Sequence, residues 1–126
     1  MAAIGENMTS KELSRKIGEF LLEKKASDVM SIDIEEKSIV ADYYVLATAK
    51  SSPHVKALSE YLEEEMDKYG VSAVRREGTR EGRWAVIDFG DVVVHIFNDE
   101  TRLFYNLEKL WGDGGNVYKF TDDDKE

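Results

Sequence analysis

Residues 83–111 read RWAVIDFGDVVVHIFNDETRLFYNLEKLW and carry most of the information about the fold. Two runs within them, 84–89 and 92–97, are apolar and rich in β-branched residues, which is typical of strands. Gly90 and Asp91 form a two-residue connection between these runs, and such a connection suits a tight hairpin in which the glycine has a positive φ. The stretch therefore predicts an antiparallel pair of strands.

A short aromatic helix is predicted directly after this hairpin. Asn98 and Asp99 are residue types that cap helix N-termini. Leu103, Leu107 and Leu110 then recur at helical spacing, so they would share one side of the helix and pack against the sheet.

The chain upstream alternates between helix and strand signals. Thr9 and Glu12 have capping-box spacing, which predicts a helix over residues 10–25. Residues 28–34 alternate between apolar and polar side chains, which predicts a strand with one buried face. Residues 39–49 are almost uncharged and predict a strand that is covered on both faces.

The clearest helix signal lies in the middle of the chain. Ser52 is a suitable N-cap, Pro53 suits the first helical position, and Gly70 suits the C-terminal cap. Residues 71–76 predict a further strand, and the order strand, helix, strand implies a parallel, right-handed crossover within one sheet. We therefore predict an α/β fold with a single mixed sheet of about five strands and helices packed on it.

Length and composition indicate one domain. The chain has 126 residues, of which 42% are hydrophobic, and this is enough for one core. We expect residues 1–9 to be flexible, residues 10–111 to form the domain, and residues 112–126 to form an acidic, flexible tail in which only Val117, Tyr118 and Phe120 are available for local docking. The absence of cysteine excludes disulfides, thiol nucleophiles and Cys-ligated zinc.

Charge and hydropathy limit the cellular locations and the binding partners that the sequence allows us to expect. No apolar run approaches the roughly 20 residues of a membrane span, and the N-terminal residues lack the features of a targeting peptide, so a cytoplasmic location is expected. The formal net charge of −9 opposes binding to phosphate backbones. It favours a basic protein partner, or it reflects only a solvated acidic surface.

Asp33 and Glu35 are a candidate catalytic pair. Their spacing on an alternating strand would place both carboxylates on one face, where they could hold a divalent cation for nucleotidyl transfer. That chemistry also needs a glycine-rich turn to hold phosphates, and residues 23–28 contain no glycine. We therefore favour a solvent-facing strand edge, without metal or cofactor.

His95 interrupts the second strand of the hairpin and points away from the face of its neighbours Val94 and Ile96. Asp88 lies across the hairpin and could come within reach of it, but the hairpin contains no serine or threonine nucleophile. Two interpretations of His95 are favoured over a catalytic base. It is either a structural histidine with satisfied hydrogen bonds or a residue that contacts a partner.

Arg102 and Tyr105 lie three residues apart in the predicted last helix, on a side away from the leucine stripe. Arginine and tyrosine are enriched at the energetic centres of protein interfaces. The pair is therefore a candidate contact surface, and the alternative is an ordinary helix surface.

Four segments together resemble the ribosomal silencing factor family, also called Iojap-like: residues 42–48 (DYYVLAT), 51–55 (SSPHV), 84–97 and 102–111. The similarity covers about residues 10–111. One departure is Ala49-Lys50 before Ser51, where members of the family usually carry a glycine. This difference would alter the turn into the following helix.

The resemblance implies a function without catalysis. A member of this family would bind the large ribosomal subunit on its fourteenth ribosomal protein, block joining of the small subunit and lower translation when nutrients are short. The family's fold is related to nucleotidyltransferases. We expect a monomer or weak homodimer with no cofactor and at most a minor contact with ribosomal RNA; a nucleotidyltransferase-like enzyme and a homodimeric structural protein are the alternatives.

The resemblance also assigns candidate residues. Among the family's shared positions, Phe97 and Trp111 are expected in the core because of their apolar character. The others are expected to contact the ribosomal protein, and they are Trp84, Asp88, His95, Arg102, Tyr105 and Glu108.

Overall fold

The computed structural model describes residues 8–98, 109, 111–112 and 115–120. Most of the predicted last helix, including Arg102, Tyr105 and Glu108, lies outside these residues. The elements along the chain are α2 (Ser10–Glu23), β1 (Ser27–Asp33), β2 (Tyr43–Ala49), α3 (Ser52–Asp67), β3 (Arg75–Glu77), β4 (Trp84–Asp88), β5 (Val92–Asn98) and β6 (Val117–Lys119).

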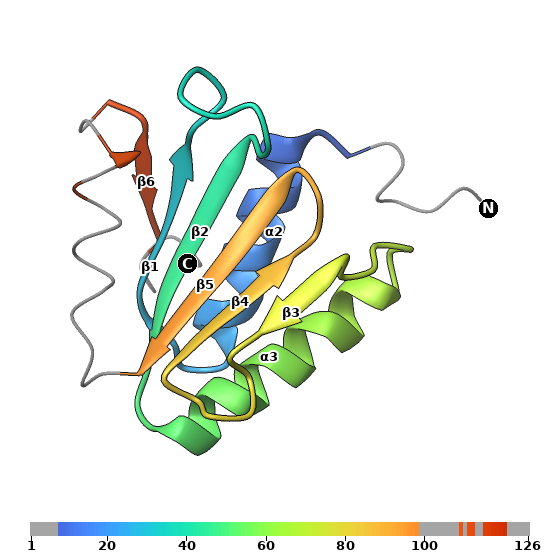
Figure 1. Ribbon diagram of the computed structural model, residues 1–126, viewed down its shortest axis with the longest axis vertical. Coiled ribbons are helices and arrows are strands. Elements are labelled where there is room, and N and C mark those ends of the chain that lie inside the picture. Colours follow the sequence, from blue (N-terminus) through green and yellow to red (C-terminus); the bar gives the residue numbers. More distant parts are fainter. Residues whose placement is uncertain (1–7, 99–108, 110, 113–114, 121–126) are drawn as a thin grey trace.

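The fold is an α/β fold built on one mixed sheet, as predicted. The sheet has six strands in the order β3-β4-β5-β2-β1-β6. β2 and β5 pair in parallel at its centre, and the other neighbouring strands are antiparallel. Both helices pack on the same face of the sheet (Figure 1).

Side-chain caps define the start of each helix. The capping box at α2 is confirmed, because the Glu12 N–H donates to Thr9 Oγ1 at 3.1 Å and the Thr9 N–H donates to Glu12 Oε1 at 2.9 Å. The N-cap of α3 is Ser51, one residue earlier than predicted, and its hydroxyl accepts from the His54 N–H at 3.2 Å. The turn that lacks the family's glycine is held by the Lys50 N–H, which donates to His54 Nδ1 at 2.9 Å.

The predicted crossover is correct in direction but not in adjacency. β3 runs in the same direction as β2, yet β5 and β4 lie between them. β5 is almost entirely buried, which suits a central strand, whereas all three residues of β3 are exposed. Burial on two faces therefore places β5 beside β2 and leaves the charged β3 at the edge.

The strand predicted over residues 39–49 begins only at Tyr43. Ile39 is 102% exposed and Val40 is 77% exposed. They follow a turn in which the N–H groups of Lys37 and Ser38 both donate to the Ile34 carbonyl at 2.9 Å. The Val40 N–H donates to the Ser38 hydroxyl at 3.1 Å. Local hydrogen bonds in this turn prevail over the β propensity of Ile39 and Val40.

The sheet gains its sixth strand from the segment predicted to be a flexible tail, so that prediction is wrong for residues 117–120. β6 pairs with β1, and the Phe120 N–H donates to the Val29 carbonyl at 2.8 Å. The Phe120 side chain is buried in the core. It lies on Gly18 of α2, where a β-carbon would be only 2.3 Å from the ring.

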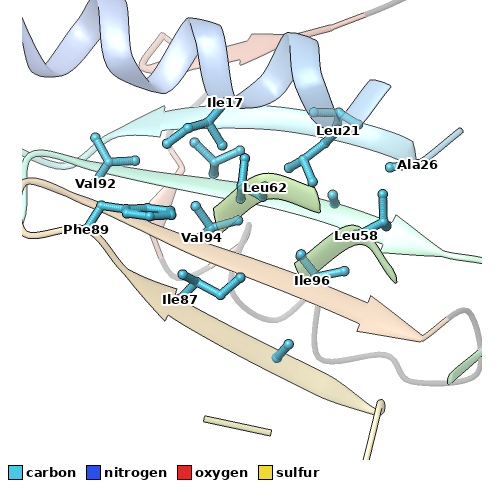
Figure 2. Close-up of a cluster of buried hydrophobic side chains, with 14 of the residues drawn as sticks. Ile17, Leu21, Ala26, Leu58, Leu62, Ile87, Phe89, Val92, Val94 and Ile96 are labelled. Carbon is cyan, nitrogen blue, oxygen red and sulfur yellow. The ribbon is translucent and has the colours of Figure 1, made fainter. Parts of the chain in front are cut away.

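Apolar side chains form a core on each face of the sheet. The larger core lies under the helices, where Ile17 and Leu21 of α2 and Leu62 of α3 meet the strands (Figure 2). The smaller core lies on the opposite face and includes Ile32 and Phe97. Because most side chains of β1, β2 and β5 point into one core or the other, the register of these strands is strongly specified.

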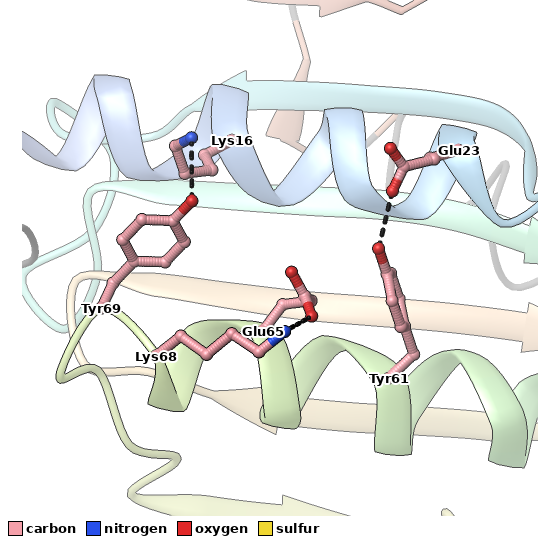
Figure 3. Close-up of polar contacts among 6 residues, drawn as sticks. All are labelled: Lys16, Glu23, Tyr61, Glu65, Lys68 and Tyr69. Atoms are coloured by element: carbon pink, nitrogen blue, oxygen red, sulfur yellow. Dashed lines mark hydrogen bonds and ion pairs between the residues drawn. The ribbon is translucent and has the colours of Figure 1, made fainter.

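Polar contacts join the two helices at the surface. The Tyr61 hydroxyl donates to Glu23 at 2.6 Å, and Lys16 Nζ donates to the Tyr69 hydroxyl at 3.4 Å (Figure 3). The bond to Glu23 raises the pKa of Tyr61 to about 12. These contacts tie α3 and the turn that follows it to α2, on the side of the molecule away from the smaller core.

Gly18→Ala tests whether the last strand is held by Phe120. Alanine favours the helix by about 1 kcal/mol, but displacing the buried Phe120 ring costs about 1.5–3 kcal/mol. We expect a net loss in the free energy of unfolding, measured by urea denaturation. In a Phe120→Ala background the same change should stabilise the protein, and a destabilising effect in both backgrounds would contradict this packing.

Candidate functional site

The candidate site lies on the sheet face opposite the helices. Alternation along β4 and β5 sends Ile87, Val94 and Ile96 toward the helices (Figure 2). The pairing of Val86 with His95 and of Trp84 with Phe97 sends these residues the other way. We call the rings on this side the aromatic face, which consists of Tyr44, Trp84, His95, Phe97 and Trp111.

Stacked rings organise the aromatic face. Trp84 stacks on Phe97, with 5.6 Å between ring centroids and 21° between planes. Phe97 is completely buried, which confirms it as a core residue, whereas Trp84 is 36% exposed. Trp111 is half-buried and meets Tyr44 edge-on at 5.3 Å. Trp84 is thus an exposed ring on a fixed apolar base.

His95 lies next to this exposed ring and is only 6% exposed. The Trp84 Nε1–H donates to His95 Nδ1 at 3.1 Å. Because an indole nitrogen can only donate, Nδ1 must be unprotonated and the neutral ring carries its proton on Nε2. His95 Nε2 is buried and has no hydrogen-bond partner among the described residues. The interpretation of His95 as a fully satisfied histidine is therefore wrong at this nitrogen.

Burial also determines the charge of His95. It lowers the pKa of His95 from 6.5 to about 4. The imidazole is therefore neutral at pH 7, and a base this weak is poorly matched to proton abstraction near neutral pH. The aromatic face offers a fixed hydrogen-bond acceptor to Trp84 and no cationic imidazole.

Asp88 does not pair with His95. It stands opposite Val93, and Val86 stands opposite His95. The Asp88 carboxylate accepts from the Gly90 N–H at 2.8 Å and so closes the hairpin turn. Gly90 has the predicted positive φ, 99°. Burial raises the pKa of Tyr44, and the negative charge of Asp88 raises it further, so this carboxylate lies within electrostatic range of the aromatic face.

The candidate catalytic pair is not arranged as predicted. β1 ends at Asp33, and Glu35 follows in an exposed turn rather than on the same strand face. Asp33 accepts from the Glu35 N–H at 3.1 Å and from the Tyr43 hydroxyl at 3.4 Å. Among the described residues no group of three or more acidic or histidine side chains is placed to hold a metal. Asp33 serves the turn instead.

Sequence reasoning missed Tyr44 as a member of the site. Its ring meets the His95 ring edge-on, with 4.8 Å between centroids. The parallel register of β2 and β5 pairs Tyr44 with Val93 and Leu46 with His95. Alternation along β2 predicts on which face of the sheet Tyr44 lies. Only the pairing of β2 with β5 brings Tyr44 next to His95.

Residues 7–126 match the model of the family described as "Ribosomal silencing factor during starvation". The chain belongs to this family. The resemblance inferred from the sequence is thus confirmed, and membership assigns the chain to a family of regulatory, non-enzymatic proteins rather than to the nucleotidyltransferase-like enzymes considered above.

Individual relatives agree with membership of the ribosomal silencing factor family. A ribosomal silencing factor of Bacillus subtilis is 42% identical over 91 residues, which cover 72% of this chain and 77% of that one. The chloroplastic protein Iojap of Zea mays is 34% identical over 71% of this chain and 39% of its own length. A crystal structure of a protein from Chromobacterium violaceum superposes with a TM-score of 0.78 at 33% identity and covers 83% of this chain and 88% of that chain.

None of the helices within the described residues has the length and apolar character needed to cross a membrane. Of the candidate contact residues, Trp84, Asp88 and His95 are described, and the sheet brings them to one face. Arg102, Tyr105 and Glu108 lie outside the described residues and remain predictions.

The buried neutral state of His95 predicts a pH dependence of stability. Its pKa is lowered on folding, so its contribution is fully present above the unfolded pKa of about 6.5 and is lost as the pH falls toward about 4. The loss is on the order of 3 kcal/mol by pH 4. Urea denaturation of the wild type and of His95→Asn at pH 7 and pH 4.5 measures it. Carboxylates titrate in both proteins, so their contribution cancels in the comparison. Only the wild type should show the additional loss of stability that His95 causes. Equal losses in the two proteins would contradict this prediction.

Proposed function

We propose that this protein binds the large ribosomal subunit through the subunit's fourteenth ribosomal protein and blocks joining of the small subunit. Translation would fall as a result when nutrients are short, and the protein would act in the cytoplasm. The observation that carries the proposal is the exposed Trp84 ring on a fixed aromatic base, with Asp88 at the other end of the same strand and on the same sheet face, opposite α2 and α3.

The chemistry of this face suits a protein partner. Tryptophan is among the residues that contribute most to protein interfaces, and a ring that is already fixed loses little conformational freedom on binding. Asp88 and the net charge of −9 complement a basic ribosomal protein. A factor that blocks subunit joining by its bulk needs affinity for the subunit and no chemistry of its own.

The sheet edges support a monomer or, at most, a weak homodimer. The edge strands β3 and β6 have three residues each. β3 has the sequence Arg75-Arg76-Glu77, and short charged edges discourage pairing between sheets. These arginines are also engaged, because Arg75 pairs with Glu77 and Arg76 with Glu63. Contact with ribosomal RNA through them is at most minor.

Co-sedimentation with purified large subunits and a subunit-joining assay test the proposal. The wild type should bind and reduce the joined fraction, and Trp84→Ala should weaken binding by about 2 kcal/mol or more, roughly 30-fold. Tyr61→Ala is the matched control, because it truncates a half-buried aromatic residue on the helix side. Stoichiometric wild-type protein that leaves the joined fraction unchanged would sink the proposal.

Tyr105 belongs to the same proposed contact surface. Tyr105→Ala should weaken binding to large subunits by roughly tenfold while it leaves the thermal unfolding midpoint nearly unchanged, as expected for a contact residue. Parallel binding and melting measurements separate the two effects. A large drop in the midpoint would instead make Tyr105 a core residue.

A further inference from the structure

The orientation of the Trp84 indole is fixed by two separate contacts. Stacking on Phe97 fixes the plane of the ring, at 21° to the plane beneath it. Stacking alone does not distinguish the two orientations of the indole that a half-turn about χ2 would exchange. The hydrogen bond from Nε1–H to His95 Nδ1, 3.1 Å long, selects one of them. The exposed edge of Trp84 therefore has one defined position.

His95 is itself unable to turn. Its ring lies nearly parallel to Phe97, at 11°, and Tyr44 closes on it edge-on at 4.8 Å. It belongs to β5, which is paired with β2 on one side and β4 on the other. Nδ1 is consequently an acceptor held in place by the sheet and by two aromatic rings.

The hydrogen bond between Trp84 and His95 has a consequence that is unfavourable for the stability of the fold. The bond to Trp84 forces the proton of His95 onto Nε2, which is buried and finds no acceptor within the described part of the chain. A buried donor that lost its bond to water and gained none destabilises the folded state. An apolar side chain of similar size would avoid this cost. The need for an acceptor at Nδ1 accounts for a histidine at this position.

We propose that His95 is a positioning residue, which acts through Trp84 by holding the indole in the orientation that the ribosomal partner contacts. This inference rests on the proposed function of the aromatic face. With 6% of its surface exposed, His95 has little area to offer a partner directly. It contributes to affinity because the partner need not order the Trp84 ring on binding.

Two substitutions of His95 separate positioning from packing. In His95→Asn, the amide Oδ1 lies near the former place of Nδ1 and can accept from Trp84, whereas His95→Leu offers no acceptor. Binding to large subunits is measured by co-sedimentation. Hydrogen exchange of the Trp84 indole N–H is measured by NMR on the free protein, with the signal assigned from its loss in Trp84→Phe.

His95→Leu should bind large subunits about tenfold more weakly, as expected for the loss of one hydrogen bond. Its Trp84 N–H should exchange faster, while its thermal unfolding midpoint stays unchanged or rises. His95→Asn should remain near the wild type in binding and in exchange. Trp84→Phe keeps an aromatic ring without the N–H, so adding His95→Leu to it should cause no further loss of binding.

The outcomes distinguish this inference from the proposed function. Failure of the wild type to bind, or Trp84→Ala binding as well as the wild type, would refute the role of the aromatic face as a whole. If Trp84→Ala weakens binding but His95→Leu does not, only the positioning role is refuted. Equal loss of binding in both His95 variants with normal Trp84 N–H protection would mean that His95 contacts the partner directly, which also overturns it.

Discussion

Burial of β5 on both of its faces is the constraint on which the rest of the structure depends. Val94 and Ile96 point into the core under the helices, so His95 and Phe97 must point the other way. A shift of one residue in pairing would exchange the two sets and bury the wrong side chains. The parallel pairing of β5 with β2 and its antiparallel pairing with β4 then bring Tyr44 and Trp84 to His95.

Within the part of the chain that the structure describes, α2 and α3 cover one face of this sheet and leave the aromatic face on the other. On the helix side, contacts such as Tyr61 with Glu23 serve to join α2 and α3. On the other side, a small apolar core supports Trp84 without covering it. The proposed steric role would use this combination of a rigid body and an aromatic face.

Stability and binding make opposite demands at His95. Folding would be favoured by an apolar side chain, since Nε2 is buried and no described residue accepts its proton. A fixed Trp84 requires an acceptor in the same place. Burial keeps the ring neutral at pH 7, and a neutral imidazole is the form in which Nδ1 can accept. The fixed orientation of Trp84 on the surface is therefore accompanied by a local loss of stability at His95.

The sequence by itself determined the features that depend on near neighbours and on local patterns. These are the capping box at Thr9, the β4–β5 hairpin with its turn at Gly90, the side to which His95 points, and membership of the family. Only the tertiary structure decided that β5 lies beside β2, that Phe120 packs on Gly18, and that Trp84 bonds to His95. These contacts join segments that are remote in sequence or depend on exact pairing. They are determined by the apolar surface that the whole sheet buries, and the local propensity of each segment does not determine them.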